Sequence, residues 1–120
     1  MPTYSGGGGG GGGMTLTILS ESSILADGTE QTLITGTGLG IYFGIISLEN
    51  MVAIDVVNIR VDGKIAVGDS YISYFRQQYL GTQADPFVHI SPKTLPYIRV
   101  TLEQVTGTYK NFKYGFYKEA

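Results

Sequence analysis

The chain has 120 residues, 42% of them hydrophobic, which is enough for one domain with a single core and excludes a wholly disordered protein. Its net charge of −2 is too small to indicate binding to nucleic acid or to an acidic membrane surface. The absence of Cys excludes disulfides and thiolate metal sites, and neither a signal peptide nor a membrane-spanning run is recognisable, so we expect a protein made in the cytoplasm.

The charges are unevenly distributed along the chain. Residues 1–59 carry five carboxylates and no Lys or Arg, whereas residues 60–120 carry eight basic and five acidic side chains. If the two halves were separate lobes, this asymmetry would favour head-to-tail contact between subunits. If their strands interleave in a sandwich, the asymmetry can cancel.

Residues 1–13 are predicted to form an N-terminal arm, and residues 14–120 the folded domain. Eight consecutive glycines, 6–13, cannot bury side chains and lose much backbone entropy on ordering, so the arm alone is a flexible coil. A glycine backbone can also approach another chain closely and bond to it. We therefore expect the stretch from Gly6 to Gly13 to lie between neighbouring subunits, with Pro2 and Tyr4 anchoring its tip.

Period-two alternation of apolar and polar residues predicts strands through most of the domain. The expected strands are 14–19, 29–35, 41–48, 56–61, a return strand that begins at 64–67 and continues through 71–79, 87–90, and the two arms of a C-terminal hairpin, 97–118. Turns are expected at Asp27-Gly28, at Asp62-Gly63 as a type I′ hairpin turn, and at Thr106-Gly107-Thr108. With about eight strands and no convincing helix, the sequence predicts an antiparallel β-sandwich of Greek-key or jelly-roll type.

The C-terminal hairpin is expected to supply most of the core. Phe112, Tyr114 and Phe116 share one face and offer roughly 150–250 Å² of apolar surface each. They should be buried against Val100, Leu102, Ile59 and Val61.

Residues 41–48 are apolar on both faces, with Ile41, Phe43 and Ile45 on one side and Tyr42, Ile46 and Leu48 on the other. Exposed apolar surface of this kind usually marks a contact. We predict that the face of Tyr42, Ile46 and Leu48 is covered by another subunit or by the first strand. Tyr74 is a further candidate for a partner-binding interface.

No constellation for catalysis or for a cofactor is apparent. His89 is the only histidine, which excludes a His-based metal triad, and we expect it to be an ordinary strand residue facing solvent or a neighbouring Tyr. The carboxylates are dispersed, no G-x-S-x-G elbow is present, and the glycine-rich stretches lack the Lys-Ser/Thr or the helix of a phosphate loop. The sequence therefore predicts no enzyme, no metal and no cofactor.

Several segments resemble, in their order, small β-sandwich proteins of tailed-virus genomes and related environmental sequences. They are residues 27–33, 46–51, 57–61, 83–86 and 100–109, followed by Phe112, Tyr114 and Phe116. The resemblance covers residues 14 to 118, and the glycine arm is not part of it. It implies a structural virion protein, such as a decoration or cement subunit that binds a capsid lattice or its own copies, with no catalytic residues to carry over.

The alternative function is a carbohydrate- or receptor-binding sandwich at a virion or cell surface. It requires an exposed aromatic platform with converging polar groups, for which the candidates are Tyr71, Tyr74, Arg76 and Gln78. A hydrolase would be supported only by an activity that disappears with His89→Ala.

Overall fold

A computed structural model describes residues 3–6 and 14–120, which form strands and loops with no helix. The strands are β1 (Thr3–Gly6), β2 (Met14–Leu25), β3 (Gln31–Ser47), β4 (Val56–Lys64), β5 (Ile72–Leu80), β6 (Phe87–Thr106) and β7 (Asn111–Glu119). The described residues therefore contain no helix that is long and apolar enough to cross a membrane.

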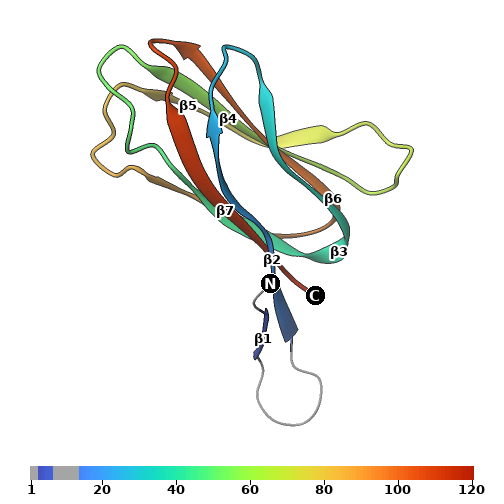
Figure 1. The fold of residues 1–120 in the computed structure, drawn as a ribbon. Helices are drawn as coiled ribbons and strands as arrows, with labels where there is room; N and C mark the ends of the chain where they lie inside the picture. Colours follow the sequence, from blue (N-terminus) through green and yellow to red (C-terminus); the bar gives the residue numbers. More distant parts are fainter. Residues whose placement is uncertain (1–2, 7–13) are drawn as a thin grey trace.

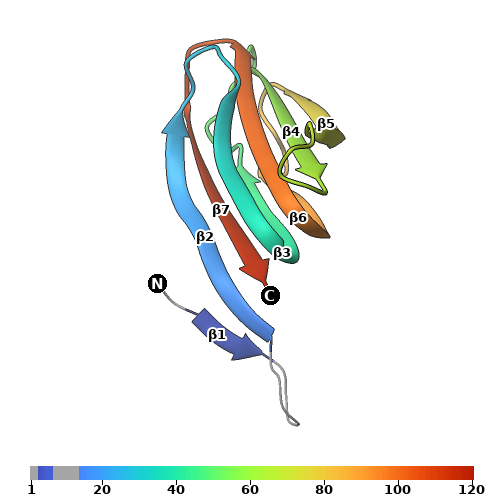
Figure 2. The ribbon, with the colours of Figure 1, turned by 90° about the vertical axis from the view of Figure 1, so that its right-hand side faces the viewer.

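The strands form one antiparallel sheet in the order β1-β2-β7-β3-β6-β4-β5, as Figure 2 shows. The predicted all-β antiparallel class is confirmed. The described residues contain seven strands instead of about eight. Two pairs of expected strands are each continuous, as β3 and β6, and β1 is not among the expected strands.

The two long strands β3 and β6 connect the halves of the sheet. Residues 40–47 of β3 pair with 87–95 of β6 and with β7, whereas residues 31–37 pair with 97–102 of β6, whose other side carries β4. A register shift between Thr37 and Gly40 separates these two parts of the ladder. We call the part around β2 and β7 the first half-sheet and the part around β4 and β5 the second (Figure 1).

The core lies between the half-sheets. Phe112 and Phe116 are 0% and 1% exposed, and they belong to one buried cluster with Ile59, Val61, Val100 and Leu102, as predicted. Tyr114 is half-buried and packs against this cluster. A core shared by two half-sheets is consistent with a β-sandwich.

The predicted C-terminal hairpin is wrong in its pairing, although the turn is in the expected place. Gly107 has a φ of 95° and follows the last residue of β6. However, β7 pairs with β2 and β3, and β3 lies between β7 and β6 in the sheet. The connection therefore passes from the second half-sheet to the first. As a result, Phe112 and Phe116 of β7 lie in one core cluster with Val100 and Leu102 of β6.

The predicted hairpin turn at Asp62-Gly63 is also wrong. Both residues lie within β4, where Asp62 is opposite Arg99 of β6 and Ser73 of β5. Asp62 is only 2% exposed, but its carboxylate oxygens lie 3.2 Å from Arg60 Nε and 2.7 Å from Arg99 Nη2. These ion pairs let a buried carboxylate continue the strand, and the chain reverses instead in the exposed loop of residues 65–71.

The expected gaps between strands at residues 36–40 and 91–96, which contain glycines and prolines, lie inside β3 and β6. Gly36 is needed for close packing, because a Cβ there would lie 2.6 Å from Tyr42 Cε1. Pro92 and Pro96 fall at the register shifts between β3 and β6 and have no partner in either ladder of β6, so their missing N–H groups interrupt no pairing.

The predicted N-terminal arm is described only in part. Thr3–Gly6 form β1 and pair with Met14–Thr17 of β2, with Tyr4 opposite Leu16 and Gly6 opposite Met14. Pro2 and the glycines from 7 to Gly13 lie outside the described residues. This short pairing extends the sheet beyond the body of the domain (Figure 1).

Candidate functional site

The residues predicted to form an exposed stripe on β3 lie in the core of the single chain. Tyr42, Ile46 and Leu48 are at most 1% exposed. Ile46 is opposite Tyr114 and Gly44 is opposite Phe116 on β7, so the even-numbered residues of β3 share the inner face with those aromatic rings. Of the two covers that we expected, another subunit is therefore wrong, since the chain covers this face itself. Leu19 and Ile24 of β2, the first expected strand, pack against the same cluster.

The other face of β3 is the outer one, and it remains apolar. Ile41, Phe43 and Ile45 are half-buried on it, and the ring centroid of Phe43 lies 5.6 Å from that of Tyr117 on β7. On the other side of β3, Phe87 of β6 is 51% exposed. We call these five residues the outer apolar stripe.

A hollow of about 360 Å³ lies over β7 within this stripe. Its lining includes Ile45, Phe87, Gly115 and Tyr117, with charged groups from Glu21, Glu49 and Lys113 around them. Gly115 makes room for the ring of Tyr117, because a Cβ there would lie 2.5 Å from Tyr117 Oη. The hollow therefore has apolar walls and a charged rim, which suits an inserted side chain of a partner protein.

The Tyr117 ring is fixed by a hydrogen bond across the first half-sheet. Its hydroxyl donates to Glu21 Oε2 of β2 at 2.8 Å. This bond, with burial and the negative charge of Glu21, raises the pKa of the Tyr117 hydroxyl. The ring is thereby held in place as one wall of the hollow before any partner arrives.

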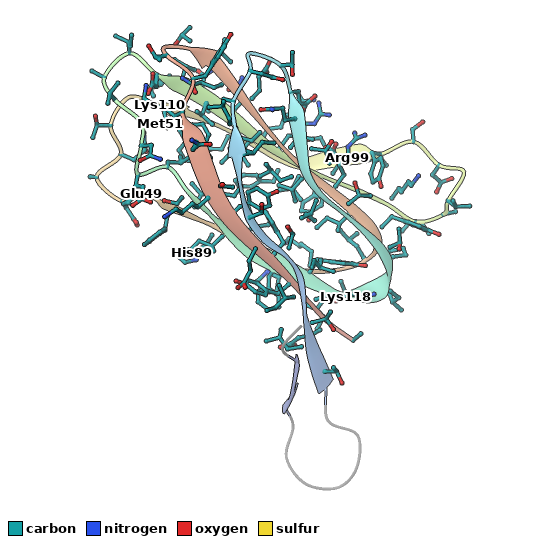
Figure 3. All side chains as sticks on the ribbon, in the orientation of Figure 1. Glu49, Met51, His89, Arg99, Lys110 and Lys118 are labelled. Atoms are coloured by element: carbon teal, nitrogen blue, oxygen red, sulfur yellow. The ribbon has the colours of Figure 1, made fainter. Side chains whose placement is uncertain are left out.

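The outer face of the second half-sheet is polar by contrast. Arg60 Nη2 lies 3.2 Å from Glu30 Oε2, which also accepts a 2.6 Å hydrogen bond from the Thr101 hydroxyl. Together with Asp62 and Arg99, these groups form a charged network across β4 and β6. Figure 3 shows Arg99 on the side of the molecule opposite His89 and Glu49.

The four residues nominated for a carbohydrate platform are not brought together. Arg76 and Gln78 line a polar hollow of about 380 Å³, while Tyr74 lines a different, apolar one beside Gly63 and Leu95. The ring of Tyr71 is occupied by cations, since Lys64 Nζ and Arg99 Cζ lie 4.6 and 4.3 Å from its centroid. A sugar would have to compete with these cations for the Tyr71 ring.

Tyr74 remains a candidate for partner binding, because it is 40% exposed. Burial of its hydroxyl and the negative charge of Asp62 raise the pKa of Tyr74 to about 12.

Among residues 3–6 and 14–120, no group of three His, Asp or Glu side chains could hold a metal ion. The sequence predicted His89 to be a strand residue facing solvent or a neighbouring Tyr; it is an exposed strand residue opposite Ile45. The described groups thus form no metal-binding set. What the first half-sheet can do is bind an apolar surface, through the outer apolar stripe.

Sequence reasoning missed Phe87 and Tyr117 and placed Phe43 on the inner face. The available signal was the apolar character of both faces of residues 41–48. Choosing between the faces requires the pairing of β3 with β7, which the sequence does not contain.

No protein-family model, curated protein or solved structure matches this chain.

Proposed function

We propose that the chain is a non-enzymatic structural subunit that binds another protein surface through the outer apolar stripe. One observation carries this proposal: an already paired central strand, β3, keeps three apolar side chains on its outer face beside Phe87 and Tyr117. A sheet face that only meets water has no need of such side chains. Continuous apolar surface of this kind is typical of protein contacts.

The partner that fits best is a capsid lattice or further copies of this chain, with the protein as a decoration or cement subunit of a virion. The resemblance of residues 14 to 118 to small virion sandwich proteins supports this choice. The mixed charges at the rim of the stripe, Glu21, Glu49 and Lys113, would set the orientation of the partner.

The test replaces Phe87 by Asp, which places a charge in the stripe at a half-exposed position with little effect on the core. Leu39→Asp is the matched control, because Leu39 is 68% exposed and lies outside the stripe. Self-association is measured by sedimentation over a range of concentrations, and lattice binding by co-sedimentation with native particles stripped of this protein. We expect Phe87→Asp to lose binding and Leu39→Asp to retain it.

Equal binding by wild type and Phe87→Asp in both assays would exclude the stripe as the contact surface. A wild-type protein that neither self-associates nor sediments with the particles would refute the proposed function as a whole.

Carbohydrate binding remains the second candidate, favoured by the polar hollow. The amides of Asn58, Gln77 and Gln78 lie there with the guanidinium of Arg76, and the side chain of Gln78 donates a 3.0 Å hydrogen bond to Asn58 Oδ1. Amides and a guanidinium can hydrogen-bond sugar hydroxyls. Glycan-array binding that disappears with Gln78→Ala would favour this function over the first.

A further inference from the structure

In the part of the chain that the structure describes, unpaired strand edges occur along β1, part of β2, residues 31–37 of β3, residues 87–95 of β6 and β5. The edges of β2 and β5 carry complementary charges and are considered together. β5 pairs only with β4, and residues 18–25 of β2 pair only with β7, because β1 covers residues 14–17 alone. Figure 2 shows β2 and β5 on opposite margins of the domain. Unpaired N–H and C=O groups along a strand edge are a template for pairing with another chain.

Each of these edge strands carries one charged residue, and the two charges have opposite sign. Glu21 is the only charged residue of β2, and Arg76 is the only one of β5. Glu21 has four residues on either side within 17–25, and Arg76 has four on either side within 72–80. An antiparallel pair of two β2 strands or two β5 strands about these centres would place like charges opposite each other, which is destabilising.

Among the described residues, Arg76 also has no ion-pair partner within 4.0 Å, although Glu30 and Glu103 line the same hollow. It lies directly opposite Arg60 on β4, but Arg60 is engaged by Glu30 and Asp62, each at 3.2 Å. Among the described residues Arg76 takes part in no ion pair, and its Nε donates only to the Ser73 hydroxyl at 3.2 Å. Two guanidinium groups on opposite strands favour the arrival of a carboxylate from outside.

We propose that β5 of one copy pairs antiparallel with β2 of a second copy, with Arg76 opposite Glu21, so that subunits join head to tail. Glu21 is exposed, and its carboxylate can accept further bonds besides the one from Tyr117. The inference rests on the proposed function, in that the partner is another copy of this chain. It assigns that contact to the sheet edges, in addition to the outer apolar stripe.

Between Ser20 and Leu25 the proposed register keeps the faces of both strands consistent, and the β-bulge between Ile18 and Ser20 ends this part of the pairing. Ser22 shares the inner face with Tyr114, and it would be opposite Phe75, which shares the inner face with Val61. At one end of the pairing, Leu25 and Ile72, which are 58% and 72% exposed, would cover each other. Because the two surfaces differ, the contact is heterologous and forms a ring or an open filament.

The unequal distribution of charge along the sequence fits this arrangement. The edge strand from the acidic half of the chain meets the edge strand from the basic half. High salt should therefore weaken the association.

The test uses two charge reversals, Glu21→Arg and Arg76→Glu, with the full chain and sedimentation velocity as the readout. Each variant alone would place like charges at its own contact, so we expect its dissociation constant to rise about tenfold or more. Mixed in equal amounts, the two variants place opposite charges at every contact that joins one variant to the other, and association should return. Asp85→Arg, at an exposed position outside β2 and β5, is the matched control and should behave as wild type.

A disulfide experiment tests the register, since the chain has no cysteine of its own. Ser20→Cys and Gln77→Cys in one chain would be opposite each other in the contact and should form intermolecular disulfides under mild oxidation. Ser20→Cys combined with Thr82→Cys, whose loop position lies outside β5, should not.

Single variants that associate as wild type does, a mixture that stays dissociated, or a wild-type chain that is monomeric throughout would overturn the inference. If the charge variants have no effect while Phe87→Asp abolishes association, the edge contact is wrong and the proposed function stands. If neither the charge variants nor Phe87→Asp weakens particle binding, the edge contact and the contact through the outer apolar stripe are both wrong.

Discussion

Replacing Gly107 with Ala should destabilise the domain more than any other single methyl addition at a turn. Gly107 forms the turn after β6 with a left-handed φ of 95°. A Cβ there would collide with the Asp55 carboxylate, approaching its Oδ1 closely and lying 2.9 Å from its Cγ. Ala must therefore adopt an unfavourable backbone conformation and displace a side chain that is 0% exposed.

The size of the effect follows from what Asp55 holds together. Its carboxylate accepts the N–H of Val52 at 2.9 Å, lies 3.3 Å from Lys110 Nζ, and is 3.4 Å from Gln104 Nε2. A left-handed Ala costs about 1–2 kcal/mol, and weakening this buried set adds about 1–3 kcal/mol. The sum of roughly 2–5 kcal/mol would lower the melting temperature by on the order of 10 °C in a domain of this size.

The assay is thermal unfolding followed by circular dichroism. Gly68→Ala is the control, because a Cβ at Gly68 meets nothing within 4 Å and its φ is not in the left-handed region. Asp55→Ala should destabilise the chain by itself, and its effect should be less than additive with Gly107→Ala. Melting of Gly107→Ala within about 2 °C of wild type would refute the reasoning, since a methyl group would then fit where the structure leaves no room.

Two further predictions concern the core and the behaviour at high pH. Phe112→Ala should cost about 3–5 kcal/mol in urea unfolding, because the ring is fully buried, and a variant as stable as wild type would show that the inner face of β7 is assigned wrongly. The pKa of Tyr74 is raised to about 12 in the folded state, so the fold favours the protonated hydroxyl. This contribution to stability is fully present below the ordinary tyrosine pKa near 10 and is lost as the pH rises towards about 12. Tyr74→Phe should therefore move alkaline unfolding to higher pH, and a Tyr74 that titrates near 10 by tyrosinate absorbance would contradict the assignment.

The features that the sequence predicts correctly are those decided by neighbouring residues. Alternation over two positions places Phe112 and Phe116 on one face whatever their partners are. The turns near Asp27-Gly28 and Gly107 follow from the backbone freedom of glycine, and both glycines have positive φ. These signals require no knowledge of the rest of the chain.

The features that the sequence predicts wrongly depend on residues far away in the chain. Asp62-Gly63 has the local chemistry of a turn, but Arg99, 37 positions later, neutralises Asp62 and keeps it in a strand. Both faces of residues 41–48 are apolar, and only the register with β7 decides that Tyr42 faces the core. Neither the pairing of Asp62 with Arg99 nor that of β3 with β7 can be recognised from the alternation of apolar and polar residues along the sequence.

The position of β7 between β2 and β3 has a consequence for the order of folding during synthesis. The pairing of Leu16 with Glu119 joins residues that are far apart in the sequence, so the first half-sheet stays incomplete until residues 111–119 have left the ribosome. Until then β2 and β3 lack the strand that lies between them, and the inner face of β3 lacks Phe112 and Phe116. Contacts at such long sequence separation also slow folding, because the chain must close a large loop before they form. A nascent chain therefore keeps the inner faces of β2 and β3 exposed until β7, a strand of nine residues, is available to pair with them.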